Sequence, residues 1–262
     1  MDSFDSNLHP ARADEGLKSL SKLIRVLDSF STTARSLSLS EVCQRTGYPK
    51  STTHRLLSSL REAGLLDQDR DRDRYRLGLK LFELGNTVLA NMDLHREARP
   101  FVDALGRLSG QAVHLAVFDG RHAVVVGRSE PQPAGGRGFF ESAPAHCTSV
   151  GKAILAHLPA PALSRFIEGG LARFTDTTIT DPEALQGELA QTRARGYAVD
   201  EGEHQPGLRC IGAPIRDVSG RVFAAISVSG PAWKLPLDEV ERTSKIVIHN
   251  AQAISQVLGY KN

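Results

Sequence analysis

Most side chains that could do chemistry lie in two segments of the second half of the chain. The first, HCTSVGK, spans residues 146–152 and leads from an irregular stretch into an expected helix. The second is the run DEGEH, residues 200–204, which is followed by Cys210 and then by Ser227 and Ser229. Thiol, imidazole, carboxyl and hydroxyl groups in such segments serve in nucleophilic catalysis, in metal binding or in holding a small polar ligand.

Ligand binding accounts for the largest number of these residues. The first backbone N–H groups of the expected helix lack intrahelical acceptors and, with the helix dipole, favour an anion. Ser227 and Ser229 are two apart on an expected strand, so they share one face. Taken singly, a buried thiol or a sheet hydroxyl is also an ordinary part of a core. Together with those amides, the residues that predict a site for a small carboxylate-bearing molecule are Asp200, Glu201, Glu203, His204, Cys210, Ser227 and Ser229.

Catalysis is the alternative use of the same residues. Cys210 would be the nucleophile, with His146 or His204 as base and Asp200 orienting it. The chain has no G-x-S/C-x-G nucleophile elbow, and its His and Cys spacings match no standard zinc pattern. We therefore expect no catalytic residue, no metal and no cofactor, and we keep an enzyme with Cys210 as nucleophile as the runner-up.

The second half has the pattern of a sheet flanked by helices. The segments VHLAVF and HAVVVG flank Asp119-Gly120, a dipeptide typical of a tight hairpin turn. CIGAPIRD and VFAAISVSG form a second hairpin around a turn that ends in Ser219-Gly220. This pattern predicts an α+β fold with an antiparallel sheet. Helices are expected at 151–158, at about 182–195 with Asp181 as N-cap and Pro182 at its first position, and at about 238–258.

The first half predicts three helices followed by a hairpin. Apolar residues at helical spacing mark a helix from Leu17 to Phe30. The segment SLSE, residues 38–41, is a capping box for a short second helix that ends at Gly47. Pro49 suits the first position of a third helix through KSTTHRLLSSLREAG. Two strands, LLDQD and YRLGLKL, around a charged tip complete the pattern of a winged helix-turn-helix.

The third of these helices has a surface suited to the major groove of DNA. Its outward side chains are short or hydrogen-bonding, whereas an ordinary solvated helix carries Glu/Lys pairs. Arg55 can bind guanine, while Lys50, Arg61 and the wing arginines are suited to phosphate. A plain helical bundle with a serine-rich surface is the alternative. The predicted DNA contacts are Lys50, Ser51, Thr52, His54, Arg55, Ser58, Arg61, Arg72 and Arg74.

A connecting helical segment joins the two halves. Residues 80–109 predict one or two helices, interrupted near Asp93 and Pro100. Their apolar stripe, formed by Leu81, Leu84, Val88 and Leu89, would pack either on a second protomer or on its own domain. The expected division is a flexible terminus at 1–15, a winged helix-turn-helix at 16–79, a linker helix at 80–100 and a ligand-binding domain at 101–262.

Composition excludes several classes of protein. The 262 residues carry 32 Lys+Arg and 30 Asp+Glu, so the net charge is close to zero. A surface that binds nucleic acid must therefore come from a local cluster of basic residues. Three widely spaced cysteines, Cys43, Cys147 and Cys210, form no disulfide framework and suit a reducing compartment. No apolar run reaches the length of a membrane span, and the first residues, MDSFDSNLHPARADEG, hold no apolar stretch behind a basic start. We therefore expect a cytoplasmic protein that contacts no membrane.

These blocks together resemble a known family. KSTTHRLLSSLREAGLL, YRLGLKLFELG, HCTSVGKAILAHLP and GYAVDEGEHQPGLRCIGAPIRDVSGRVFAAISVSGP are similar to the isocitrate-lyase-regulator (IclR) family of bacterial transcription factors, from about residue 16 onward. The resemblance implies a winged helix-turn-helix, a GAF-like effector domain, and dimers or tetramers that repress or activate catabolic genes in response to small organic or aromatic acids. It places the family's helix-three motif on Lys50, Ser51, Thr52, His54 and Arg55. It places the family's effector pocket on the backbone amides of Ser149 and Val150 and on Asp200, Cys210, Ser227 and Ser229.

One segment departs from the family pattern. Before the helix the chain reads GGRGFFESAPAHC, a longer and more aromatic approach than relatives have. Arg137 would pair with an effector carboxylate while Phe139 and Phe140 pack on an aromatic ring; alternatively, this loop packs on the sheet with Arg137 exposed. We predict an effector-controlled regulator whose partners are operator DNA, an acid and itself. A structural DNA-binding protein without a ligand is the third option.

Overall fold

The computed structural model describes residues 10–31, 33–68, 73–90, 92–130 and 142–261, which belong to two compact units, Met1–Val88 and Leu89–Asn262. Each unit has a hydrophobic core of its own. Among the helices in these ranges, none combines the length and apolar character needed to cross a membrane.

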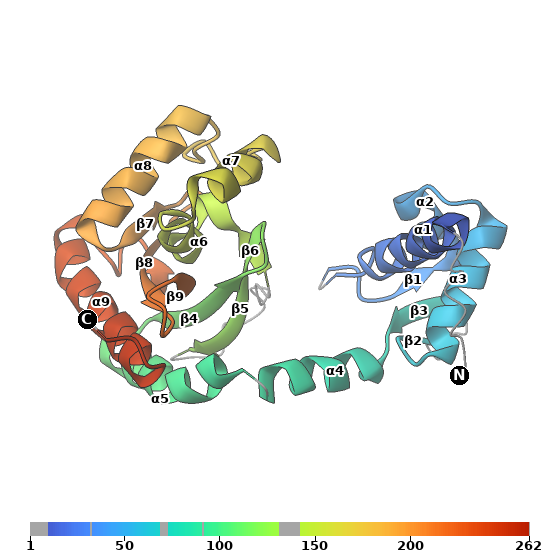
Figure 1. The fold of residues 1–262 in the computed structure, drawn as a ribbon, viewed down its shortest axis with the longest axis horizontal. Helices are drawn as coiled ribbons and strands as arrows, with labels where there is room; N and C mark the ends of the chain where they lie inside the picture. The colour runs from blue at the N-terminus through green and yellow to red at the C-terminus, as the bar shows by residue number, and fades with distance from the viewer. Residues whose placement is uncertain (1–9, 32, 69–72, 91, 131–141, 262) are drawn as a thin grey trace, which may run out of the picture. The chain divides into compact units, whose positions relative to one another are not determined.

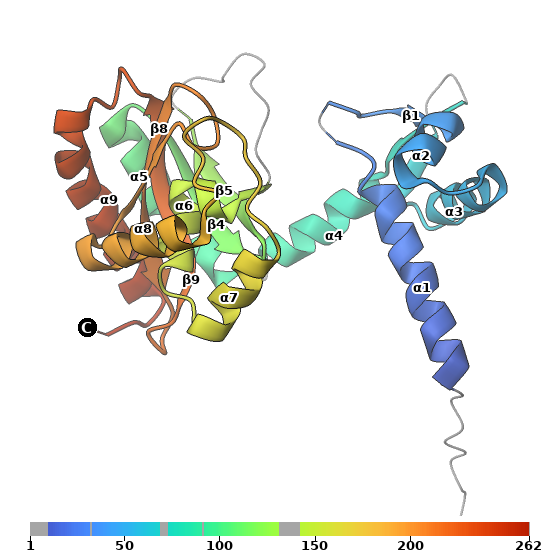
Figure 2. The ribbon, with the colours of Figure 1, turned by 90° about the horizontal axis from the view of Figure 1, so that it is seen from above.

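The first unit is a helical cluster with a small sheet. Helices α1, α2 and α3 pack on one another, as Figure 2 shows, and the described strands pair antiparallel in the order β1-β3-β2. Its elements are α1 Pro10–Leu27, β1 Leu37–Ser38, α2 Leu39–Thr46, α3 Lys50–Glu62, β2 Leu66–Gln68 and β3 Arg74–Leu77, and α4, Leu79–Ala90, crosses the boundary between the units.

Local signals set the helix-turn-helix. The Ser38 side chain accepts the Glu41 N–H, and the Glu41 carboxylate accepts the Ser38 N–H at 2.7 Å, so the predicted capping box is confirmed. Gly47 ends α2 in the left-handed conformation at φ 74°, which glycine adopts without strain. The inner face of α3 buries Leu56, Leu57 and Leu60.

Several predicted boundaries were wrong in this unit. Helix α1 begins at Pro10 instead of Leu17 and ends at Leu27, so residues 10–15 are helical, while 1–9 lie outside the described residues. Pro49 is the N-cap of α3 and not its first residue. Strand β1 was not predicted, because two residues carry too little pattern.

The second unit is an antiparallel sheet between two layers of helices. Over the described residues the strand order is β6-β5-β4-β9-β8-β7, and the two predicted hairpins are confirmed as β4–β5 and β8–β9. The elements are α5 Asp93–Ser109, β4 Ala112–Phe118, β5 His122–Ser129, β6 Ser142–Pro144, the 3-10 turn η1 Ala145–Cys147, α6 Ser149–Leu155, α7 Ala160–Glu168, α8 Pro182–Arg195, β7 Ala198–Glu201, β8 Leu208–Arg216, β9 Val222–Pro231 and α9 Leu237–Val257.

The helices divide between the two faces of this sheet (Figure 1). Helices α5 and α9 pack on the face where Leu115, Ile211 and Ile226 point, which forms the largest core. Helix α6 covers the opposite face, with α7 and α8 packed beyond it. Pro100 lies inside α5 without ending it, contrary to the predicted interruption, whereas the break near Asp93 is present as the start of α5.

The predicted apolar stripe of the linker is largely exposed in α4. Leu84 is 49% and Val88 58% exposed, and Phe82, which the stripe did not include, is 66% exposed. Leu81 is half-buried, and the side chain of Leu89 is not among those that the structure describes.

Candidate functional site

The register of the sheet brings polar residues from four strands into adjacent rows. Asp200 on β7 pairs with Cys210 on β8, and Cys210 pairs in turn with Ser229 on β9. Ser227 of β9 lies opposite His114 of β4. Since paired residues of antiparallel strands point to one side of a sheet, all five side chains lie on the face that α6 covers.

Two glycines allow close packing around α6, Gly212 where β8 meets the helix and Gly151 where the turn η1 meets it. A Cβ added at Gly212 would be 2.8 Å from the carbonyl carbon and oxygen of Ser149, and one at Gly151 would be 2.2 Å from the carbonyl oxygen of Ala145. Real Cβ atoms essentially never approach so closely, so any larger residue would move the helix. The close approach brings the first residues of α6, Ser149 and Val150, against the polar rows of the sheet.

A cavity of about 90 Å³ lies between the start of α6, the sheet and the turn after β7. It has room for several water molecules, or for a compact ligand in their place. The six described residues that were predicted to bind a ligand all line it: Ser149, Val150, Asp200, Cys210, Ser227 and Ser229. Arg137, Phe139 and Phe140 lie outside the described residues. The structure therefore brings the six together, and ligand contact by each of them stays a prediction.

Sequence reasoning missed other residues of the cavity. The imidazole of His114 has its Nδ1 3.3 Å from Oγ of Ser229. His114 lies between two buried apolar residues of β4, so strand alternation already placed it on the opposite face, but the pairing of β4 with β9 has no local signal. The lining residues not predicted are His114, Ala123, Val125, Ala143, Thr148, Gln205 and Leu208, whereas His204 was among the candidates named above.

The Asp200 carboxyl has an unusual electrostatic environment. Burial, together with the negative charge of Glu203, raises its pKa to about 7 from an ordinary value near 3.8. Hydrogen bonds from the backbone N–H groups of Glu203 and His204 oppose that rise only in part. At neutral pH Asp200 is thus divided between a charged acceptor and a neutral group that can also donate a hydrogen bond.

The two thiols of this region are protonated. Burial is the main cause that raises the pKa of Cys147 to about 12, and it also raises the pKa of Cys210. The nearby Asp200 carboxylate adds to both shifts. Burial also lowers the pKa of His114, so its imidazole is neutral. A cysteine nucleophile needs a thiolate near neutral pH. The environment of Cys210 therefore favours a packing or ligand-contact role over nucleophilic catalysis.

The predicted alternative triad is assembled only in part. His204, Asp200 and Cys210 line the same cavity, whereas His146 is not among its described lining residues. The Nε2 atom of His146 lies 2.9 Å from the carbonyl oxygen of Ala172. Burial is the main cause that lowers the pKa of the His146 and His204 imidazoles.

In the first unit, α3 presents the predicted polar face. Ser51, His54 and Arg55 are exposed, Thr52 and Ser58 are half-buried, and these positions alternate with the buried leucines of the same helix. Lys50 and Arg61 at the two ends are exposed as well. The helix therefore combines a buried apolar face with an outer face of hydroxyl, imidazole and basic groups.

Two predicted phosphate contacts are engaged within the unit. Arg74 donates from Nη2 to the carbonyl oxygen of Ser36 and lies 3.1 Å from the Glu41 carboxylate. Arg61 donates to Oε1 of Gln68 at 2.8 Å and stays exposed. Arg74 thus stabilises the junction of β3 with α2, a role that the sequence did not reveal. Arg72 lies outside the described residues.

Comparison with known proteins assigns the two halves separately. Residues 86–256 match the bacterial transcriptional regulator IclR C-terminal domain, and residues 19–70 match the IclR helix-turn-helix domain. The chain is 34% identical to the HTH-type transcriptional regulator XynR of Escherichia coli (strain K12), with 93% of this chain and 98% of XynR covered. It is 36% identical to the HTH-type transcriptional repressor AllR of Klebsiella pneumoniae, with 95% and 93% covered.

Solved structures agree with these assignments. The crystal structure of the Thermotoga maritima IclR is 31% identical and has a TM-score of 0.69, with 93% of this chain and 100% of that chain covered. An IclR homolog from Microbacterium hydrocarbonoxydans, complexed with 4-hydroxybenzoate, is 27% identical and has a TM-score of 0.76, with 92% and 98% covered.

Proposed function

The chain belongs to the IclR family of bacterial transcriptional regulators, and we propose that a small organic or aromatic acid, bound in the cavity at the start of α6, controls its affinity for operator DNA. The observation that carries the proposal is the convergence on one cavity of hydroxyl, thiol and carboxyl groups from three strands with the first residues of α6. An effector can regulate only through different affinities for two states of the protein.

The cavity suits an acid with a compact carbon skeleton. The carboxylate oxygens would accept hydrogen bonds from the N–H groups of Ser149 and Val150 and from the hydroxyls of Ser227 and Ser229. In its neutral form Asp200 would donate as well. The carbon skeleton would pack on the apolar wall formed by Ala123, Val125, Ala143 and Leu208. Since a family relative is complexed with 4-hydroxybenzoate, aromatic acids are the first class to test.

Helix α3 would enter the major groove of the operator. Arg55 is exposed near the middle of α3 and would contact guanine O6 and N7, while Ser51, Thr52 and His54 contact neighbouring base edges. Lys50, Arg61 and Arg72 would bind phosphate, and Ser58 would lie along the groove wall. We leave Arg74 out of the contact set because Ser36 and Glu41 already engage it.

We further propose that the chain acts as a dimer or a tetramer on catabolic genes, inside the cytoplasm where the DNA lies. The exposed apolar side chains of α4, Phe82, Leu84 and Val88, would pack against a second protomer. Dimer geometry would then set the spacing of two DNA half-sites. We propose no catalytic role for this chain, since the surroundings of Cys210 raise the pKa of its thiol and keep it protonated.

A melting titration tests the effector site. Full-length protein is heated with benzoate, 4-hydroxybenzoate, pyruvate or acetate, each at 10 mM, and the Ser227→Ala/Ser229→Ala double variant serves as the matched control. At least one acid should raise the melting temperature of the wild type and not that of the variant, because a ligand that binds only the native state stabilises it. Equal melting of both proteins with every acid would count against the site.

A further inference from the structure

We propose that Glu203 is a positioning residue of the effector site, which fixes the Asp200 carboxyl in the cavity and joins it to α6. The inference rests on the proposed effector site. Glu203 is not among the described residues that line the cavity, and neither is Lys152, so both would act through their neighbours. Glu203 is 5% exposed and makes contacts from its N–H, its carbonyl oxygen and its side chain.

The backbone of Glu203 links the cavity to the segment before α8. Its N–H donates a hydrogen bond of 2.8 Å to Oδ1 of Asp200. Its carbonyl oxygen accepts one of 2.6 Å from Oγ1 of Thr178 and one of 3.1 Å from Oγ1 of Thr175. Thr175 also donates to the carbonyl oxygen of Gly202 at 2.8 Å. The turn that follows Asp200 is therefore held by two threonine hydroxyls.

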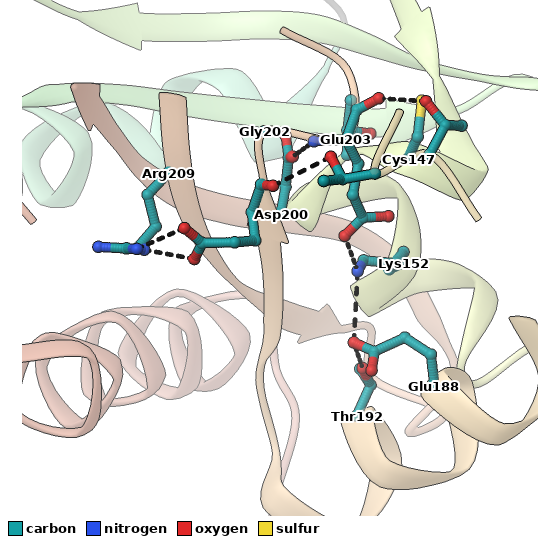
Figure 3. Close-up of polar contacts among 12 residues, drawn as sticks. Cys147, Lys152, Glu188, Thr192, Asp200, Gly202, Glu203 and Arg209 are labelled. Atoms are coloured by element: carbon teal, nitrogen blue, oxygen red, sulfur yellow. Dashed lines mark hydrogen bonds and ion pairs between the residues drawn. The ribbon is translucent and has the colours of Figure 1, made fainter. Parts of the chain in front are cut away.

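The side chain of Glu203 links the same turn to α6 (Figure 3). Oε1 of Glu203 lies 2.5 Å from Nζ of Lys152, a residue of α6 that is 1% exposed. The Lys152 ammonium also lies 3.3 Å from Oε1 of Glu188 on α8. Nη2 of Arg195 lies 2.8 Å from the same Glu188 oxygen. Lys152 comes one turn after Ser149, so its ion pairs fix the helix end that faces the cavity.

Stability alone is a poor explanation for this cluster. Taking an ammonium and a carboxylate out of water costs free energy that their attraction repays only with complete hydrogen bonding. Oε2 of Glu203 is buried and has no hydrogen-bond partner among the described residues, so the bonding is incomplete. An apolar pair of similar volume would fill the same space, whereas the charged pair fixes a specific geometry.

The cluster also controls the charge of Asp200. The Glu203 carboxylate raises the pKa of Asp200 and the Lys152 ammonium lowers it. Replacing Glu203 by Gln should therefore lower the pKa, and removing the Lys152 charge in that background should raise it again. The titratable groups packed around Asp200 are Glu203 and His204 in its own turn, Cys147 before α6, Lys152 on α6, Cys210 on β8 and His114 on β4.

A ligand-free titration tests the proposal on the full-length protein. The side-chain ¹³C carboxyl signal of Asp200 is assigned by its loss in Asp200→Asn and followed against pH. We expect a midpoint near 7 in the wild type and about 1 pH unit lower in Glu203→Gln. The midpoint should move back upward in Glu203→Gln/Lys152→Met, a reversal that a merely structural loss would not produce. Glu201→Gln is the matched control, because Glu201 follows Asp200 on β7 but its carboxylate pairs with Arg209 on β8. The Asp200 midpoint in this variant should match that of the wild type.

An unmoved midpoint in Glu203→Gln, or no reversal in the double variant, would overturn the inference. If Glu203→Gln does not fold, Thr178→Val replaces it, with amide hydrogen exchange as the readout. The Glu203 N–H should then exchange at least tenfold faster than in the wild type, and unchanged exchange would equally overturn the inference. Neither readout needs a ligand, so failure of the chain to bind any acid would contradict the proposed function and leave this result standing.

Discussion

Gly212 on β8 lies directly against Ser149 at the start of α6, so closely that a Cβ on Gly212 would be 2.8 Å from the Ser149 carbonyl carbon. The neighbour is backbone, which cannot rotate away as a side chain can. The shape of the cavity therefore depends on the absence of a side chain at this position. The cavity floor, Cys210 and Ser227, lies on the same strand pair.

We predict that Gly212→Ala displaces α6 and abolishes acid-dependent stabilisation. The crowding should cost about 1–3 kcal/mol of stability, which calorimetry or chemical denaturation measures. Gly187→Ala is the matched control, because nothing lies within 4 Å of a Cβ added there on α8. The control should be stabilised by up to about 1 kcal/mol. Full acid binding by Gly212→Ala would show that the cavity does not need this contact.

Acid binding should weaken as the pH rises above 7. The folded-state pKa of Asp200 is raised to about 7, so the carboxyl is neutral below that value and charged above it. A charged Asp200 repels an anionic effector, and binding must then be coupled to the uptake of one proton. Isothermal titration with a bound acid should show affinity that is constant below pH 6 and falls up to tenfold per pH unit above 7.

Asp200→Asn provides the control for this pH dependence. The amide resembles the neutral carboxyl in shape and in its ability to donate. Its affinity for the acid should stay level between pH 6 and 9, while the wild type loses affinity over the upper part of that range. A parallel loss in both proteins would assign the titration to another group.

Two substitutions on α3 should differ in how they affect DNA binding. Arg55→Ala removes a predicted base contact, so it should cost about 1–3 kcal/mol of binding free energy on the operator and relax the preference at one base pair. Lys50→Ala removes a predicted phosphate contact, so it should weaken all sequences alike and reduce the salt dependence. Fluorescence anisotropy over a set of operator variants at several salt concentrations separates the two. Wild-type behaviour of both variants would remove α3 from the interface.

The thiol of Cys210 should react slowly with iodoacetamide at pH 7. Its pKa is raised by burial and by Asp200, so almost no thiolate is present. Cys43→Ser removes the half-buried thiol of the first unit, and mass spectrometry then follows Cys147 and Cys210 alone. Labelling should require denaturation. Rapid modification of Cys210 in the native protein would revive the hypothesis of an enzyme with a cysteine nucleophile.

Local patterns predicted much of the site, because capping and alternation act within a few residues. The box at Ser38 and Glu41, the αL residue Gly47 and the N-cap Asp181 are where the sequence places them. Strand alternation likewise predicted that Ser227 and Ser229 share a face. Such signals depend on neighbours along the chain and need no knowledge of the tertiary fold.

The features that were missed depend on contacts between distant segments. His114 joins the cavity only because β4 pairs with β9. Arg74 on β3 forms an ion pair with Glu41 on α2, and helix α3 lies between these two residues in the sequence. The role proposed for Glu203 rests on Lys152 and Thr178, from two other segments. Pro100 fits inside α5, where propensity alone favours a break.

The most direct test of the account is a DNA-binding titration with and without acid. Full-length protein is titrated on the promoter region beside its own gene at 100 mM salt, with benzoate, 4-hydroxybenzoate, pyruvate or acetate, and with the Ser227→Ala/Ser229→Ala variant in parallel. We predict a specific complex whose affinity one of the acids changes at least fivefold in the wild type and not in the variant. A specific complex that every acid leaves unchanged, or that changes equally in the variant, would contradict control of DNA binding through this cavity.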